Sequence, residues 1–434
     1  MGGRSLAAMN SLLSIPRRAA RGGVLVIGGG FAGSYVARRL GKAGATIVNP
    51  TNFMLYTPLL PEAASGTVEP RRVVVPIRTM CPHAELVVGA VEEMDAYNKV
   101  ARVRTETGMI DLTFDEVVVA LGALTRIPDV PGVREHALPF KDLADAIALR
   151  NHVLHQLELA DADLDGAERR LTFAFVGAGY AGVEALAEAH DLVRSSLRHY
   201  PRLRDVPQRW LLVDSGDRVL AQAPERLGAY AARDLARRGI EIRLGTRLRE
   251  LDADGALFSD GTRVDTATLV WAAGVQPNPA VRSLGLPVDD SGRAVVDEYL
   301  RVEGMPGVWA LGDCAAVPNA ATPGEHDPAT CQHALRQARR LVRNLRGTPR
   351  PYRYRTLGQV ASLGRRRGIA QLPGVRLRGL DGWLAARAYH LMQLPSPARR
   401  SRVLVDWITS GLFRRDIAEL SALNAAGARE VQRA

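Results

Sequence analysis

Cysteine, lysine and long apolar runs are all scarce in this sequence. The three cysteines, Cys81, Cys314 and Cys331, lie far apart and form no C-x-x-C pair, so neither a disulfide framework nor a zinc site is indicated, and a reducing compartment is expected. No apolar stretch reaches the roughly 18 residues that a membrane-spanning helix needs. These absences exclude disulfide-stapled, zinc-binding and membrane-spanning classes of protein.

Positive charge is abundant although lysine is not. Basic residues outnumber acidic ones by 57 to 46, for a net charge of +11, and only Lys42, Lys99 and Lys141 are lysines. Such a charge favours anionic partners, among them nucleic acid, acidic lipid headgroups and pyrophosphate cofactors. No basic stripe with interleaved aromatic residues supports nucleic acid, so we expect no such partner. The basic, acid-free segment 1–22 is expected to be a disordered tail in preference to a targeting segment.

A glycine-rich turn follows the first apolar strand of the chain. The segment 23–49 has the pattern of a strand, a turn, an amphipathic helix and a second strand. Gly28, Gly30 and Gly33 have the G-x-G-x-x-G spacing, in which the glycines permit a tight turn, backbone approach to a pyrophosphate and close helix packing. An acid usually ends the second strand to bind ribose hydroxyls, but here Asn49 does. The unit predicts a dinucleotide site with an uncharged ribose contact.

The same arrangement returns in the segment 171–214. Gly177, Gly179 and Gly182 repeat the spacing between a strand and a helix, and the second strand ends in Asp214. A carboxylate at that position accepts hydrogen bonds from both ribose hydroxyls and repels a 2′-phosphate, so NADH is favoured over NADPH. The chain therefore contains two nucleotide-binding units of related pattern.

Two further carboxylates stand close to buried turns. Glu184 lies two residues after the last glycine of the second turn, where it would lie beside a bound nicotinamide; a first-turn Glu that interacts with the helix dipole is an equally good interpretation. Asp313 follows a third buried strand and can accept a hydrogen bond from the ribityl chain of a flavin. Arg218 keeps NADPH open as the donor. Two dinucleotides make chemical sense when one delivers hydride and a flavin accepts it.

The order of these segments predicts an α/β fold with two Rossmann-type dinucleotide-binding domains, one inserted in the other. Clusters of proline and glycine at 128–132 and 276–279 mark expected boundaries. Beyond about residue 351, arginine-rich stretches alternate with apolar and aromatic residues, which is typical of amphipathic helices. We expect a FAD-binding domain at 23–138 and 277–350, an NAD(H)-binding domain at 139–276 and a C-terminal helical interface region at 351–434.

Several stretches within residues 23–420 together resemble the type II NADH dehydrogenases, a family of flavoproteins with two dinucleotide-binding domains. The resemblance implies FAD in the first unit, NADH in the second, hydride transfer to the flavin, and a quinone as electron acceptor without proton pumping. The stretches that carry it include NFMLYTPLLPEAASGTVEPRRVVVPIR at 52–78, FDEVVVALGA at 114–123, FVGAGYAGVEALAE at 175–188, LVWAAGV at 269–275, WALGDCAAVP at 309–318 and CQHALRQAR at 331–339.

The resemblance also implies roles for single residues. Glu184 corresponds to the family's carboxylate beside nicotinamide and flavin. Gln332 corresponds to the first Gln of an A-Q-x-A-x-Q quinone motif, from which the chain departs, because Cys331 replaces the Ala and Arg336 the second Gln. Gln337 follows one residue later, and a polar helix face is the alternative interpretation. The implied set is Gly28, Gly30, Phe31, Ala32, Gly33, Asn49, Ala120, Gly122 and Asp313 for FAD, Gly177, Gly179, Tyr180, Gly182, Asp214, Ala273 and Gly274 for NADH, and Pro58, Leu59, Gln332, Arg336 and Gln337 for the acceptor.

The C-terminal region corresponds to helices that rest on the membrane surface in this family. Buried aromatic residues with snorkelling arginines would provide such a contact. We expect a cytoplasmic protein that attaches peripherally to the inner face of the cell membrane. The alternative is a helix pair that forms a homodimer or only covers a domain.

Other functions remain to be weighed against quinone reduction. A disulfide reductase of this architecture needs a close cysteine pair after the first unit, and a sulfide:quinone reductase needs cysteines facing the flavin; the sequence supports neither. A reductase of a small redox protein is the main alternative, because the altered acceptor motif and the basic charge would suit an acidic partner. A redox sensor that binds FAD and NADH with little turnover is the other.

Overall fold

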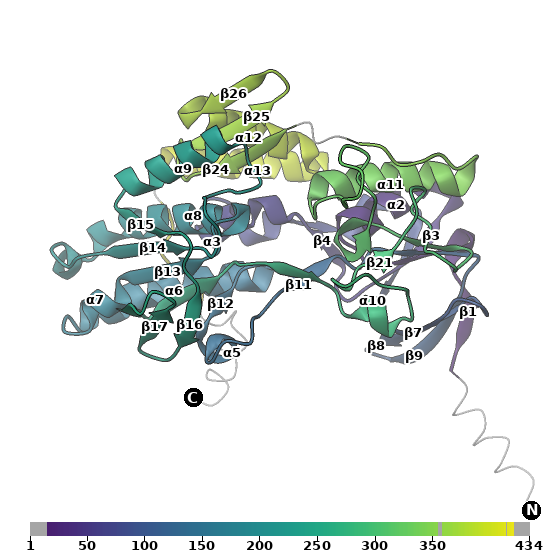
Figure 1. Cartoon of the computed structure of the whole chain (residues 1–434), viewed down its shortest axis with the longest axis horizontal. Coiled ribbons are helices and arrows are strands. Elements are labelled where there is room, and N and C mark those ends of the chain that lie inside the picture. Colours follow the sequence, from purple (N-terminus) through teal and green to yellow (C-terminus); the bar gives the residue numbers. More distant parts are fainter. Residues whose placement is uncertain (1–14, 355–357, 414, 421–434) are drawn as a thin grey trace, which may run out of the picture. The chain divides into compact units, whose positions relative to one another are not determined.

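The computed structural model describes residues 15–354, 358–413 and 415–420, and the chain divides into two compact units (Figure 1). The first unit comprises residues 1–54, 75–124 and 276–356, and the second comprises residues 55–74, 125–275 and 357–434. This grouping differs from the expected domain ranges, because the short segment 55–74 and the C-terminal region both join the unit that holds the second glycine turn.

The first unit is built on a five-stranded parallel sheet with the strand order β22-β10-β2-β3-β6. The strands are short and almost wholly apolar, which suits a parallel sheet that is buried on both faces. Helix α2 (Phe31–Leu40) follows β2 and packs against α11 (Cys331–Arg346). The strand bounds are Val308–Ala310 for β22, Glu116–Val119 for β10, Val24–Ile27 for β2, Ala45–Asn49 for β3 and Ala84–Val88 for β6.

A second sheet in this unit corrects one expectation about the N-terminal segment. Strands β7 (Ala90–Asp95), β8 (Val100–Thr105) and β9 (Gly108–Thr113) form an antiparallel meander. Strand β1 (Arg17–Ala19) adds to β9 in parallel, and Arg18 forms an ion pair with Glu85. The segment 1–22 is therefore not disordered throughout, because the exposed edge of β9 offers backbone partners to residues 17–19. The expectation for residues 1–14 lies outside the described residues.

The second unit has its own five-stranded parallel sheet, in the order β12-β19-β13-β14-β15. All five residues of β13 are buried, and Phe173 stacks on Trp210 of the next strand with ring centroids 4.3 Å apart. Helix α6 (Leu143–Ala162) begins with a capping box formed by Asp142 and Asp145. The bounds are Leu138–Pro139 for β12, Thr268–Trp271 for β19, Thr172–Val176 for β13, Arg209–Val213 for β14, Ile240–Arg243 for β15, Tyr180–Ser196 for α8, Glu225–Arg237 for α9, and Leu248–Leu251, Gly255–Phe258 and Arg263–Asp265 for the small antiparallel sheet β16-β17-β18.

The C-terminal part of this unit is a three-stranded antiparallel sheet followed by two helices. Strands β24 (Gln359–Ser362), β25 (Gly368–Leu372) and β26 (Val375–Arg378) lead into α12 (Gly379–Gln393) and α13 (Pro397–Leu412). Helix α12 packs on β25, and β24 contacts α8 (Figure 1). Within the described ranges, no helix has both the length and the apolar character that crossing a bilayer requires.

Two glycines let α12 approach β25 closely. A Cβ on Gly382 would lie 2.4 Å from the carbonyl oxygen of Gly368, and a Cβ on Gly368 would lie 2.8 Å from the backbone nitrogen of Trp383. Any larger residue at either position would push the helix away from the sheet. This contact therefore determines the distance between α12, which carries Trp383, and strand β25.

We expect Gly382→Ala to lower the free energy of unfolding by about 1–3 kcal/mol, because the added methyl group has no room against the Gly368 carbonyl. Chemical denaturation of the purified protein measures this change. Gly411→Ala in α13 is the matched control, since no atom of the described residues outside its own helical turn lies within 4 Å of the added Cβ, and it should raise stability by about 0.4–1 kcal/mol. Equal losses in the two variants would show that the close approach is not what matters.

Candidate functional site

The first glycine turn has the geometry of a dinucleotide loop. Gly28 has a φ of 102°, and a Cβ there would lie 2.4 Å from the Ala120 carbonyl oxygen. A Cβ on Gly33 would lie 1.9 Å from the Gly28 carbonyl oxygen. A Cβ on Gly30 would meet no atom of the described residues within 4 Å, apart from its chain neighbours. The outer two glycines are thus required by packing, and the middle one faces open space at the N-terminus of α2, where a phosphate fits.

The second glycine turn repeats this geometry. Gly177 has a φ of 115°, and its Cβ would lie 2.8 Å from the Ala272 carbonyl oxygen. A Cβ on Gly182 would lie 1.9 Å from the Gly177 carbonyl oxygen, and a Cβ on Gly179 would again meet nothing within 4 Å. The N-terminus of α8 therefore offers a second cradle for a pyrophosphate.

The residue that ends the second strand braces the glycine turn in both units. In the first unit, Asn49 Oδ1 accepts a hydrogen bond from the Gly29 N–H at 2.7 Å. In the second, Asp214 Oδ2 accepts one from the Ala178 N–H at 2.6 Å, and its other oxygen accepts from Gly216 at 2.7 Å. Asparagine thus keeps the bracing bond that an acid makes in the related unit, and only the charge is lost.

The other residues expected near the cofactors lie around the same turns. Gly122 and Gly274 have φ values of 65° and 79° and follow β10 and β19. The Tyr180 hydroxyl donates a hydrogen bond to Gln359 Oε1 at 3.0 Å, and burial raises the Tyr180 pKa well above its usual range. The remaining members of the set follow the same pattern: Phe31 and Ala32 lie in the first turn of α2, Ala120 directly follows β10, and Ala273 is the second residue after β19.

Helix α11 holds the altered acceptor motif and lies in the first unit. Gln337 is buried; its Oε1 accepts from the Gly312 N–H at 2.8 Å and its Nε2 donates to Asp327 at 3.0 Å, so its amide supports the turn that carries Asp313. Arg336 stacks on the Tyr354 ring, whose hydroxyl donates to Gln332 Oε1 at 3.5 Å. Gln337 is therefore a buried residue that hydrogen-bonds to two neighbouring segments, and it is not part of a solvent-exposed polar helix face.

A cavity in the second unit brings together three of the predicted residues. Pro58 and Leu59, in the turn η3 (Thr57–Leu59), line it together with Glu184 of α8. Helix α12 closes the other side with Trp383, Arg387 and two further residues. The cavity has a volume of about 10 Å³, room for one water molecule, and we call it the acceptor cavity. Its remaining lining residues are Pro61, Glu62, Ser362, Ala386 and His390.

Glu184 is largely enclosed in this cavity wall. Its Oε1 accepts a hydrogen bond from the Ser362 N–H at 2.7 Å. Burial, followed by repulsion from Glu62 and Glu188, raises the pKa of Glu184 to about 8. The side chain therefore holds a proton at neutral pH and can release it under mild conditions, as a general acid requires.

Sequence patterns predicted no role for the residues of α12 and α3 (Leu60–Ala64) that line the cavity with Glu184. The Arg387 guanidinium lies 3.9 Å from the Trp383 ring centroid and 4.6 Å from that of Trp407, and it pairs with Glu62 at 3.4 Å. Trp407 Nε1 also donates to Glu62. Burial raises the pKa of Glu62 and lowers that of Arg387. Among the described residues, neither Trp383 Nε1 nor Arg387 Nε has a hydrogen-bond partner. The wall of the acceptor cavity therefore contains two buried N–H groups that could donate to a ligand.

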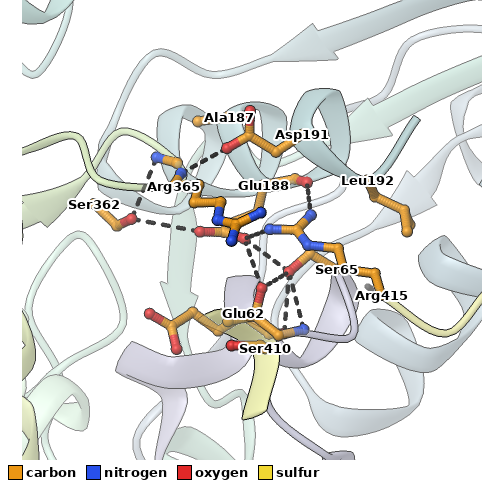
Figure 2. Close-up of polar contacts among 12 residues, drawn as sticks. Glu62, Ser65, Ala187, Glu188, Asp191, Leu192, Ser362, Arg365, Ser410 and Arg415 are labelled. Atoms are coloured by element: carbon orange, nitrogen blue, oxygen red, sulfur yellow. Dashed lines mark hydrogen bonds and ion pairs between the residues drawn. The ribbon is translucent and has the colours of Figure 1, made fainter. Parts of the chain in front are cut away.

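A buried carboxylate one turn further along α8 gathers several segments (Figure 2). Glu188 Oε2 accepts hydrogen bonds from Ser65 at 2.7 Å and Thr67 at 3.3 Å, and it pairs with Arg415 at 3.2 Å. The Ser362 hydroxyl donates to its Oε1 at 3.5 Å. The spacing of four residues between Glu184 and Glu188 places both on one helix face, a signal that the sequence already contained.

The Glu184 pKa predicts a pH-dependent stability difference. Between roughly pH 4.3, the usual Glu value, and pH 8, only the folded chain keeps the proton, so stability falls as pH rises through this window. Glu184→Gln is neutral throughout and escapes this loss. Its Tm relative to the parent should therefore increase from about pH 5 to pH 8 and then level off. Glu225→Gln, at an exposed position of α9, is the control and should give a flat difference.

Comparison with known proteins agrees with this geometry. Residues 22–338 match the model of the pyridine nucleotide-disulphide oxidoreductase family. A probable NADH dehydrogenase of Dictyostelium discoideum is 28% identical over 93% of this chain and 94% of its own, and the type II NADH:quinone oxidoreductase NdhA of Mycobacterium tuberculosis is 29% identical over 90% and 87%.

The fold has a close match among solved structures. NDH2 from Plasmodium falciparum in complex with NADH has a TM-score of 0.83 at 18% identity, covering 91% of this chain and 99% of that one. The predicted α/β fold with two dinucleotide-binding units, and the resemblance to type II NADH dehydrogenases, are confirmed. Since the family model spans more than half of the residues, the chain belongs to the pyridine nucleotide-disulphide oxidoreductase family.

Proposed function

We propose that the protein is a FAD-dependent NADH dehydrogenase that reduces a quinone. The observation that carries the proposal is the acceptor cavity, in which Pro58, Leu59 and Glu184 meet two unpartnered donors of α12. Two glycine turns with open middle glycines support binding of two dinucleotides. The name of the Mycobacterium relative supports the same reaction, and that of the Dictyostelium relative supports NADH oxidation.

The two turns fit different nucleotides. The first, with the uncharged Asn49 and with Asp313 on a turn of the same unit, would hold FAD; the second, with Asp214, would hold NADH. When bound, FAD supplies a hydride acceptor that can pass two electrons onward. The glycine turns bind the pyrophosphates through helix N-termini, and Asp214 is placed to bind the ribose hydroxyls of NADH.

The acceptor cavity supplies what a quinone needs when it becomes a quinol. Reduction adds two protons as well as two electrons, and Glu184 holds one proton at neutral pH because its pKa is about 8. The N–H groups of Trp383 and Arg387 can orient a carbonyl oxygen. At about 10 Å³ the cavity does not admit a ring, so entry requires side chains of its wall to move. Gln332, Arg336 and Gln337 stay predictions as acceptor residues.

The C-terminal helices support attachment to the inner face of the cell membrane. Apolar residues on α13 are exposed at positions that share one helix face, and α12 exposes three more. Exposed apolar surface of this kind marks a contact site. A homodimer stays a prediction. The exposed residues are Leu380, Leu384, Met392, Leu404, Val405, Ile408 and Leu412.

Anaerobic stopped-flow absorbance with sequential mixing tests the reaction. NADH should bleach the flavin, and a soluble quinone should then reoxidise it. In Glu184→Gln we expect bleaching to persist while reoxidation slows on the order of a hundredfold, because the proton donor is lost. Glu225→Gln serves as the control. Bleaching followed by no reoxidation in the parent protein would reject quinone and favour a small redox protein as the acceptor.

Asn49 suggests a test of Asp214. Asp214→Asn should keep the bond to Ala178, as Asn49 keeps its bond to Gly29, while removing the charge that repels a 2′-phosphate. The ratio of kcat/KM for NADPH to that for NADH should rise in Asp214→Asn and Asp214→Ser, and the KM for NADH should rise more in the Ser variant. An unchanged ratio in both would remove Asp214 from cofactor selection.

A further inference from the structure

A second, larger cavity in the same unit is lined by six arginines. It lies between the C-terminal half of α8, the tip of the β24–β25 hairpin and the residues that follow α13, and its volume is about 600 Å³. We call it the arginine pocket. Its arginines are Arg194, Arg198, Arg365, Arg366, Arg367 and Arg415.

Most of this positive charge is not neutralised by the protein. The one acid in the lining, Asp191, already accepts from Arg238 at 3.2 Å and from the Arg365 N–H at 2.6 Å (Figure 2). Among the described residues, no carboxylate lies within 4 Å of the guanidinium groups of Arg194 or Arg366. Arg194 and Arg366 are also exposed, so the pocket presents free guanidinium groups to solvent.

The residue at the tip of the β24–β25 hairpin is an arginine, although its backbone conformation favours glycine. Arg366 has a φ of 59°, in the left-handed region that side chains larger than those of glycine or asparagine rarely adopt. The turn closes through a hydrogen bond from the Arg367 N–H to the Gly364 carbonyl at 3.2 Å. Backbone strain that is retained at an exposed charged position points to a use for that charge.

One rim of the arginine pocket is apolar. Leu412 and Phe413 line it and are 76% and 69% exposed. They continue the exposed face formed on α13 by Leu404, Val405 and Ile408. A small hydrophilic anion would gain nothing from this rim, whereas a phosphate that carries a hydrocarbon chain would contact both surfaces.

We propose that the arginine pocket binds the phosphate headgroup of an anionic membrane lipid. Guanidinium groups pair with phosphate oxygens through two parallel hydrogen bonds, and Arg194 and Arg366 are free to do so. The acyl chain runs past Leu412 and Phe413 into the bilayer. The inference rests on the membrane contact proposed above and adds the class of lipid that this contact selects.

The pocket also adjoins the acceptor cavity through shared walls. An intermediate cavity of about 210 Å³ is lined by Arg365, Arg366 and Arg415 on one side and by Trp383 and Arg387 on the other. A lipid headgroup in the arginine pocket would therefore lie close to the acceptor cavity, where Trp383 and Arg387 of α12 are proposed to contact the quinone. The bound lipid thereby positions this face of the unit at the membrane surface.

Vesicle flotation of the full-length protein tests the proposal. The protein is mixed with phosphatidylcholine vesicles alone or with vesicles that also contain phosphatidylglycerol. We expect tighter binding to the anionic vesicles, and a roughly 25-fold loss of that preference in Arg194→Gln/Arg366→Gln, at about fivefold per arginine. The matched control is Arg247→Gln/Arg249→Gln, which removes two exposed arginines around the start of β16, at the far end of the unit from α13 in Figure 1, and it should change the preference less than twofold.

A second variant separates lipid binding from folding. Arg366→Gly relieves the left-handed strain, so it should weaken binding to anionic vesicles while leaving Tm equal to or above that of the parent. A fall in Tm together with the lost binding would assign Arg366 a structural role and overturn the proposal.

The remaining outcomes distinguish the pocket from the proposed reaction. Equal flotation on neutral and anionic vesicles would overturn the lipid site while leaving membrane contact intact. Full displacement from anionic vesicles by millimolar inorganic phosphate, at constant ionic strength, would assign the pocket to free phosphate and also overturn the proposal. Quinone reoxidation of the flavin, measured without vesicles, should occur at the same rate in the parent and in the double Arg variant. Its absence from both proteins would contradict the proposed reaction without bearing on the lipid site.

Discussion

The buried carboxylate of Glu188 is the interaction on which the second unit depends most. It is 2% exposed and binds Ser65 and Thr67 from one segment, Ser362 from β24 and Arg415 from beyond α13. Burying an unpaired carboxylate lowers the stability of the folded state by roughly several kcal/mol, so these partners must be present together in the folded protein. One side chain thereby joins the segment 55–74 and the C-terminal region to α8, and this explains why both belong to the second unit.

Helix α8 places each function of this unit at a different turn. Its N-terminus at Gly179 leaves room for a pyrophosphate, Glu184 faces the acceptor cavity one turn later, and Arg194 lines the arginine pocket near the end. Repulsion from Glu62 and Glu188 adds to burial in raising the Glu184 pKa. The same packing that Glu188 holds together thus helps to keep a proton on Glu184, since moving α3 away would expose the site to water.

Sequence patterns predicted those parts of the site that depend on residues close together in the chain. The two glycine turns and the strand-end residues follow from the spacing within one βαβ unit. For Glu184 the spacing left two interpretations equal, and its role, like those of Pro58 and Leu59, followed from the family resemblance. Trp383, Arg387 and Glu62 could not be found in this way, because an amphipathic pattern indicates helices at residues 379–412 but not which surface they cover. The contact between Trp407 and Glu62 spans 345 residues, and the approach of α12 to β25 depends on Gly368 and Gly382 being opposite each other.

The scarcity of lysine has a structural counterpart in these contacts. The Arg387 guanidinium lies over two indole rings and also pairs with Glu62, so one flat cation contacts aromatic faces and donates from its edge. A lysine ammonium could make the ion pair but has no planar surface to lie over the rings. Arg378 and Arg336 stack in the same way on Tyr230 and Tyr354. At these positions the guanidinium plane acts as a packing surface, so replacing arginine by lysine would keep the charge and lose the contact that holds the helix in place.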